Sequence, residues 1–204
     1  ANVPPDIATL TEETPNDTNS QHQDGALGYS VWNGDPDLAP HRVDLFRFVF
    51  PSFKVLQLTQ YEAFTEGNWE KLKFPFFNGE GYWLGNATNA YCEDAHQFLR
   101  KAFAILHQYE DAFCSDDVEP LVPTLLPTVY ANRFTGKEHT VWTLLNAQFR
   151  TFRGDCLQVP HKPRTRYLEA FSGKEIEGRI KAGTAILPVE LGPRGVGCVV
   201  AVRS

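Results

Sequence analysis

Two adjacent carboxylates, Glu12 and Glu13, follow a short apolar run in residues 6–12. Carboxylic acids exchange protons with reacting groups, and carboxylates also act as nucleophiles, so such residues are suited to acid–base chemistry. If residues 6–12 form a strand, alternation sends the two side chains in opposite directions. The alternative is that both are solvated acids of the polar loop at residues 14–24.

A second group of polar and aromatic residues follows the next predicted strand, residues 25–32. Trp32 ends this strand, and it either stacks on a ligand or belongs to the core. Asp35 can accept hydrogen bonds from ligand hydroxyls, whereas Asp37 is better explained as the N-cap of a helix.

A third candidate is Glu80, which lies between two glycines and is followed by Tyr82 and Trp83. It belongs to a long aromatic segment, residues 61–91, and connections of this length are usually functional. Glycines allow a ligand to approach the backbone closely, so Glu80 could face a substrate. The alternative is an aromatic loop packed against the C-terminal part of the chain.

Strands and helices are predicted to alternate in residues 1–117. The strands are expected at residues 6–12, 25–32 and 54–59. One helix is expected to end near Phe50, with Leu45, Phe46, Val49 and Phe50 on its inner side, and another spans residues 91–114. This alternation is typical of an α/β barrel, whose active site forms at the carboxyl ends of the strands. Two or three strands cannot close a barrel of eight. We therefore expect residues 1–117 to be the terminal strand–helix units of an incomplete TIM barrel.

Residues 118–204 are predicted to form an all-β antiparallel sandwich. Short segments rich in β-branched and aromatic residues are separated by turns that contain proline and glycine. Gly136 lies in a predicted hairpin loop, and Trp142 is expected in the core of the strand that follows. The predicted strands are residues 128–134, 140–145, 156–159, 166–170, 184–190 and 197–202.

Composition excludes several function classes. The formal net charge is −6 and no basic run is present, so we expect no nucleic-acid partner. No apolar stretch approaches the roughly 20 residues of a membrane span. The four cysteines show no metal-ligand spacing, and we expect neither a metal nor a cofactor. The cellular compartment stays open, since a soluble cytoplasmic, periplasmic or secreted protein fits equally well. The sequence contains no methionine, which favours a piece of a longer protein.

The chain resembles the C-terminal portion of bacterial TIM-barrel glycoside hydrolases and their hydrolase-like relatives. The resemblance extends over nearly the whole chain and is carried by TEETPND, SQHQDGALGYSVWNG, HRVDLFRFVFPSFKVLQL, FFNGEGYW, VYANRFTGKEHTVWTLLNAQFRTFRG and ILPVELGPRGVGCVVAV. In that family a barrel is followed directly by a small β-sandwich. The parent protein would then hydrolyse O-glycosidic bonds of a carbohydrate substrate with a pair of carboxylates.

The resemblance also assigns roles to the candidate residues. It implies that Glu13 or Glu12 is one catalytic carboxylate, while the other lies in the missing part of the parent barrel. Sugar-binding residues would be Trp32, Asp35, Glu80, Tyr82 and Trp83. We expect this chain alone to be inactive. The alternative function is a non-catalytic carbohydrate-binding or structural interaction module.

Overall fold

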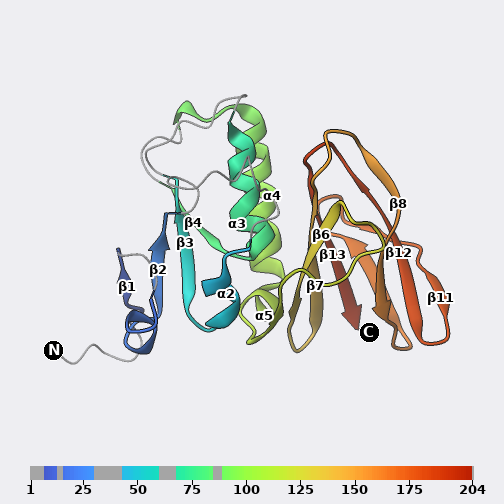
Figure 1. Ribbon diagram of the computed structural model, residues 1–204, viewed down its shortest axis with the longest axis horizontal. Helices are drawn as coiled ribbons and strands as arrows, with labels where there is room; N and C mark the ends of the chain where they lie inside the picture. The colour runs from blue at the N-terminus through green and yellow to red at the C-terminus, as the bar shows by residue number, and fades with distance from the viewer. Residues whose placement is uncertain (1–6, 13–15, 30–42, 60–67, 85–88, 204) are drawn as a thin grey trace.

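The N-terminal part of the protein contains a four-stranded parallel sheet. The structure is a computed structural model of residues 1–204, which describes all residues except 1–6, 13–15, 30–42, 60–67, 85–88 and 204. The strands lie in the order of the sequence and every neighbouring pair is parallel (Figure 1). They are β1 (Leu10–Thr11), β2 (Gly25–Gly28), β3 (Lys54–Leu58) and β4 (Gly81–Trp83).

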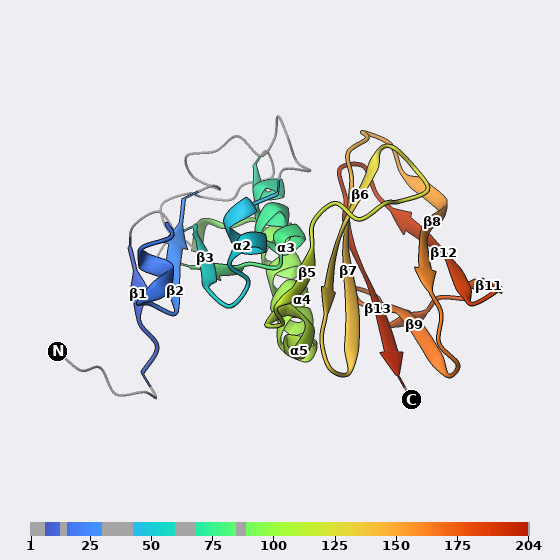
Figure 2. The ribbon, with the colours of Figure 1, turned by 60° about the horizontal axis from the view of Figure 1, so that its bottom comes forward.

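Helices cover one face of this sheet and separate it from the C-terminal part, as Figures 1 and 2 show. The helical elements are η1 (Asn19–Gln21), α2 (Leu45–Val49), η2 (Trp69–Leu72), α3 (Lys73–Asn78), α4 (Glu93–Gln108) and α5 (Glu110–Phe113). In α4, Ala95, Phe98, Leu99, Ala102 and Ile105 are buried, which is the spacing of one helix face. The helix predicted at residues 91–114 is therefore confirmed, with a break at Tyr109.

The C-terminal part is an antiparallel β-sandwich, as predicted. Its larger sheet has the order β10-β9-β13-β7-β6-β5, and its smaller sheet has the order β11-β12-β8. The strands are β5 (Asp117–Glu119), β6 (Val129–Thr135), β7 (His139–Asn146), β8 (Phe152–Pro160), β9 (Thr165–Glu169), β10 (Lys174–Glu175), β11 (Arg179–Lys181), β12 (Thr184–Leu191) and β13 (Val196–Arg203).

The helices pack on the larger sheet and share a core with it. Phe76 of α3 and Phe113 of α5 belong to the same buried cluster as Phe134 of β6. The carbonyl of Phe77 in the last turn of α3 accepts hydrogen bonds from two sandwich side chains, Asn132 Nδ2 at 2.8 Å and Thr143 Oγ1 at 2.6 Å. These bonds satisfy a carbonyl that has no partner within its own helix. The N-terminal and C-terminal parts are therefore tightly packed on each other.

The predicted inner face of the helix ending near Phe50 is wrong in part. Leu45 and Val49 are 66% and 64% exposed, while Arg47 is only 1% exposed. Arg47 is buried because its guanidinium donates hydrogen bonds to backbone carbonyls, to Phe113 O at 2.6 Å and to Gly79 O at 3.2 Å. Helical periodicity alone does not reveal a buried charge that is satisfied by distant carbonyls.

The expectation of a long connection at residues 61–91 is also wrong in part. Within it the structure places η2, α3 and β4, so the parallel sheet has a fourth strand rather than two or three. Because β4 has only three residues and begins with Gly81, its alternation is too short to be recognised in the sequence.

Candidate functional site

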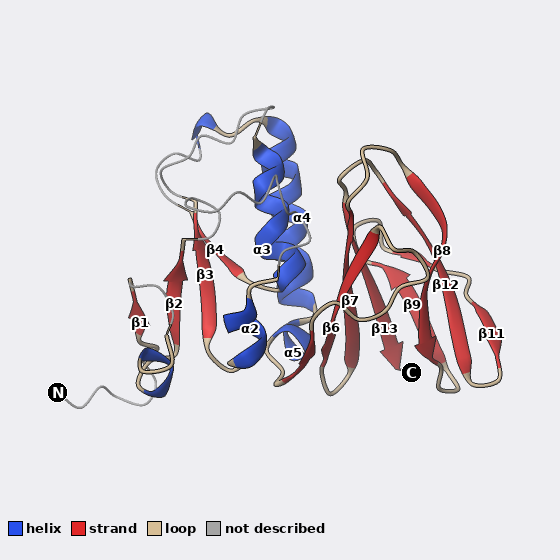
Figure 3. Ribbon diagram, viewed as in Figure 1, coloured by secondary structure: helices blue, strands red, loops and turns tan. Residues whose placement is uncertain are grey.

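The carboxyl ends of the four parallel strands form one edge of the sheet (Figure 3). The residues that directly follow the strands are Glu12, Tyr29, Thr59 and Leu84. Among these four, all of which the structure describes, Glu12 is the only acid. In open α/β sheets and in barrels, ligands bind at the carboxyl ends of the strands. We therefore take this edge as the candidate site.

Hydrogen bonds connect neighbouring strand ends along this edge. The hydroxyl of Tyr29 donates to the carbonyl of Glu12 at 2.7 Å, which links the ends of β1 and β2. Thr59 Oγ1 donates to the carbonyl of Trp83 at 2.9 Å, and Tyr91 Oη donates to the carbonyl of Thr59 at 2.9 Å. The backbone at the strand ends is thereby fixed while the Glu12 carboxylate remains exposed. Tyr29 and Thr59 were not among the predicted site residues, because isolated hydroxyl side chains carry no distinctive spacing.

Tyr82 and Trp83 point to opposite faces of the sheet. The ring of Tyr82 packs on Phe103 of α4 at 5.4 Å between centroids, so Tyr82 faces the helices. Its hydroxyl donates to the carbonyl of Leu72 at 2.7 Å, and burial raises its pKa well above the ordinary value. Side chains alternate along a strand, so Trp83 faces away from the helices, and it is partly exposed.

Glu80 lies in the interior, before the first residue of β4, and thus at the opposite edge from Trp83. Its side chain is only 2% exposed, and its Oε2 accepts a hydrogen bond from Gln57 Nε2 at 2.9 Å. Burial raises the pKa of Glu80 well above its usual range, and the neighbouring Asp44 carboxylate adds to this effect. The protonated form of Glu80 is therefore favoured in the folded protein, and in that form the carboxyl group can hydrogen-bond to Asp44. The sequence suggested a substrate-facing loop, whereas the structure shows a buried carboxyl group.

Asp44 and Arg47 complete the charged cluster around Glu80. Asp44 caps α2, because its Oδ1 accepts a hydrogen bond from Phe46 N at 3.0 Å. Burial lowers the pKa of Arg47, and the nearby Glu80 opposes this effect. Arginine keeps its charge in proteins. The charged guanidinium of Arg47 therefore lies near two carboxyl groups, those of Asp44 and Glu80, which partly offset the cost of burying it.

The structure does not bring the predicted acids together. Glu12 follows β1 and Glu80 precedes β4, so three strand spacings, about 14 Å, separate their strands. The two residues also lie at opposite edges of the sheet. The remaining candidates Glu13, Trp32 and Asp35 lie outside the described residues, as does Asp37.

Neither a metal site nor a membrane-spanning helix is found in the described part of the chain. There, no three histidine, cysteine, aspartate or glutamate side chains are grouped in a way that could hold a metal ion. None of the described helices is long and apolar enough to cross a membrane.

The solved structures that resemble this chain include several glycoside hydrolases, although no protein-family model and no curated protein matches the sequence. An Anoxybacillus alpha-amylase is 11% identical with a TM-score of 0.60, and the match covers 96% of this chain and 52% of that one. A maltogenic alpha-amylase from Thermotoga neapolitana is 11% identical with a TM-score of 0.60, and the match covers 95% of this chain and 54% of that one. Alpha-galactosidase I from Mortierella vinacea is 8% identical with a TM-score of 0.55, and the match covers 92% of this chain and 55% of that one.

The chain thus spans about half the length of each of these three structures. At such low identities the likeness concerns the fold. The protein has a glycoside hydrolase-like fold.

Proposed function

We propose that this chain is the C-terminal portion of a carbohydrate-active enzyme whose parent hydrolyses O-glycosidic bonds with a pair of carboxylates. The observation that carries the proposal is the order of the elements. Four parallel strands follow one another in the sheet with helices on one face, and an antiparallel sandwich then packs on those helices. The likeness to alpha-amylases and an alpha-galactosidase over nearly the whole chain supports it.

In this proposal residues 1–117 are the last four strand–helix units of a (β/α) barrel, and residues 118–204 are its C-terminal sandwich. The sheet face away from the helices supports this assignment. Trp83, at one edge of that face, is partly exposed, and Leu10, at the other edge of the sheet, is 51% exposed. Parallel sheets are normally covered on both faces. The remainder of the parent barrel, with four further strands, would provide the cover and pair with the open edges of β1 and β4.

The proposed active site lies at the carboxyl ends of the strands. Glu12 or Glu13 would supply one catalytic carboxylate, and the partly exposed Trp83 would contact a sugar ring together with Trp32 and Asp35. Glu80 and Tyr82 would support the strands from the interior. Retaining and inverting enzymes hold their two carboxyl groups about 5–10 Å apart. Among the four described residues that directly follow the strands, Glu12 is the only acid. In this proposal its partner comes from the remainder of the parent, and this chain alone would be inactive.

The test compares this chain with the full-length parent on a panel of aryl glycosides. We expect no turnover by the chain. In the parent, Glu12→Gln or Glu13→Gln should lower kcat by at least about 10²–10⁴-fold, the usual contribution of one acid or base. Glu177→Gln removes an exposed carboxylate of the sandwich and serves as the matched control.

Two outcomes would contradict the proposal. If the isolated chain hydrolysed an aryl glycoside, and either substitution abolished this turnover, the proposal that the active site needs the remainder of the parent would be refuted. A parent that binds sugars but hydrolyses none would show a carbohydrate-binding module instead.

A further inference from the structure

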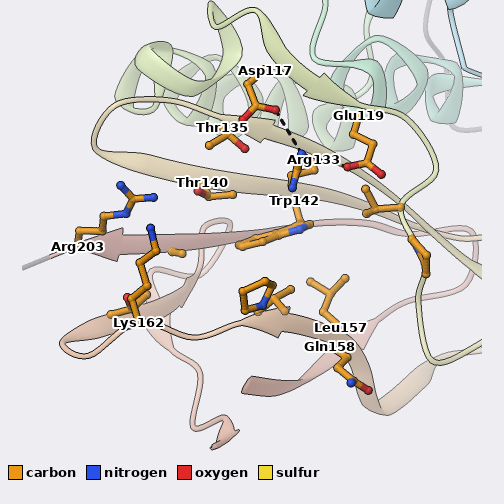
Figure 4. Close-up of a pocket in the computed structure, with 16 residues that line it drawn as sticks. Asp117, Glu119, Arg133, Thr135, Thr140, Trp142, Leu157, Gln158, Lys162 and Arg203 are labelled. Carbon is orange, nitrogen blue, oxygen red and sulfur yellow. Dashed lines mark hydrogen bonds and ion pairs between the residues drawn. The ribbon is translucent and has the colours of Figure 1, made fainter. Parts of the chain in front are cut away.

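A cleft of about 420 Å³ opens between the two sheets of the sandwich, far from the strand edge described above (Figure 4). One wall comes from β5, β6, β7 and β13 of the larger sheet, and the other comes from β8 and the residues that follow it. This volume is within the range of cavities that hold small molecules.

The middle of the cleft is apolar. Trp142 of β7 and Leu157 of β8 face each other across it and are 6% and 1% exposed. In Figure 4 the Trp142 indole lies between the two sheets and extends towards Lys162 and Arg203. An indole beside an open cavity offers a large apolar surface to the ring of a ligand.

The two ends of the cleft differ in charge. At one end, Arg133 is paired with Asp117 at 3.2 Å and with Glu119 at 3.0 Å. The two carboxylates outnumber the single guanidinium, so this end keeps acceptor oxygens for ligand hydroxyl groups. It is therefore suited to a polar, hydroxyl-rich part of a ligand.

The other end carries two cations, Lys162 and Arg203, which both line the cleft. Within the described residues neither has an ion pair or a side-chain hydrogen bond, and Figure 4 shows them at the same end. Two neighbouring positive charges that are paired with none of the described carboxylates favour an anion, and a guanidinium matches the geometry of a carboxylate.

We propose that this cleft binds a sugar acid. Its carboxylate pairs with Lys162 and Arg203, its ring lies against Trp142, and its hydroxyls donate to the carboxylates of Asp117 and Glu119. The site is separate from the proposed catalytic edge. It gives the sandwich a binding function of its own that does not depend on hydrolysis.

The test is a titration of the full chain followed by NMR through the indole N–H signal of Trp142, assigned with Trp142→Phe. The probes are glucuronate, glucose and acetate. Glucose carries the sugar ring without the carboxylate and acetate carries the carboxylate without the ring, so the contribution of each group to binding is measured separately. Glucuronate should bind with at least about tenfold higher affinity than either of the others, equivalent to about 1.4 kcal/mol.

Arg203→Gln and Lys162→Gln should each weaken glucuronate binding several-fold and leave the weak binding of glucose unchanged. Lys181→Gln removes an exposed lysine from β11 and should change nothing, as should Glu12→Gln at the proposed catalytic edge. Equal affinity for glucose and glucuronate, or for acetate and glucuronate, would overturn the proposal. So would glucuronate binding that is indifferent to both cation substitutions.

Discussion

Replacing Glu80 with glutamine is expected to make the stability of the chain less sensitive to rising pH. Burial, together with the neighbouring Asp44 carboxylate, raises the pKa of native Glu80 well above the ordinary value, so the folded chain holds this proton to higher pH. In the unfolded chain the same group ionises near the ordinary glutamate pKa of about 4.3. Above that pH the unfolded state binds fewer protons than the folded state, so the free energy of unfolding falls as pH rises.

The size of this pH dependence follows from the single proton of the Glu80 carboxyl group. Wherever Glu80 is protonated in the folded state and ionised in the unfolded state, it lowers the free energy of unfolding by about 1.4 kcal/mol per pH unit. Glutamine has no proton to release, so Glu80→Gln removes this slope. Its amide oxygen can still accept the hydrogen bond from Gln57, and its amide nitrogen can donate to Asp44. The variant should therefore gain stability relative to the unmodified chain as pH rises.

The measurement is urea unfolding followed by circular dichroism at several pH values from about pH 4 to 8. The difference in unfolding free energy between Glu80→Gln and the unmodified chain should grow with pH above the ordinary glutamate pKa. Glu177→Gln, at an exposed position, should show no such trend. A difference for Glu80→Gln that is constant over the whole range would show that Glu80 is ionised in the folded protein, and the reasoning would fail.

Four further substitutions test the packing by the same unfolding measurement. Gly79 and Gly173 both have positive φ, at 65° and 69°, but a Cβ at Gly79 would lie 2.7 Å from Phe134 whereas Gly173 has open space. Gly173→Ala should cost about 1–2 kcal/mol and Gly79→Ala about 1–3 kcal/mol more; equal costs would contradict the packing. Trp142→Ala should cost about 3–5 kcal/mol, and unchanged stability would show that its burial is misjudged. Arg47→Met should cost about 3–5 kcal/mol because buried carbonyls lose their donor, and a neutral result would refute that role.

Much of the sandwich is predictable from the sequence because strand alternation is local. The predicted strand at residues 140–145 became β7, in which Trp142 is buried as expected. The strand at residues 184–190 became β12 with alternating burial. The short edge strands β10 and β11 were missed, since two or three residues show no period.

The candidate site was harder to predict, and Glu80 shows why. Its neighbouring glycines suggested room for a ligand, but they serve packing instead. Gly79 lies against Phe134, and a side chain at Gly81 would collide with Leu56. A glycine needed for ligand access and one needed for close packing look the same in a single sequence. Burial of Glu80 and the opposite directions of Tyr82 and Trp83 depend on where a three-residue strand begins, which the sequence does not specify.

The capping of α3 by the sandwich has a consequence for the order of folding. The carbonyl of Phe77 is satisfied by Asn132 of β6 and Thr143 of β7. In the sheet, β7 is held between β6 and β13, the last of the described strands. During synthesis the helices leave the ribosome long before β13, and contacts across such sequence distances form slowly. The helix layer therefore reaches its final state only after β13 has been made, and until then its phenylalanine-rich face is a surface for a chaperone to protect.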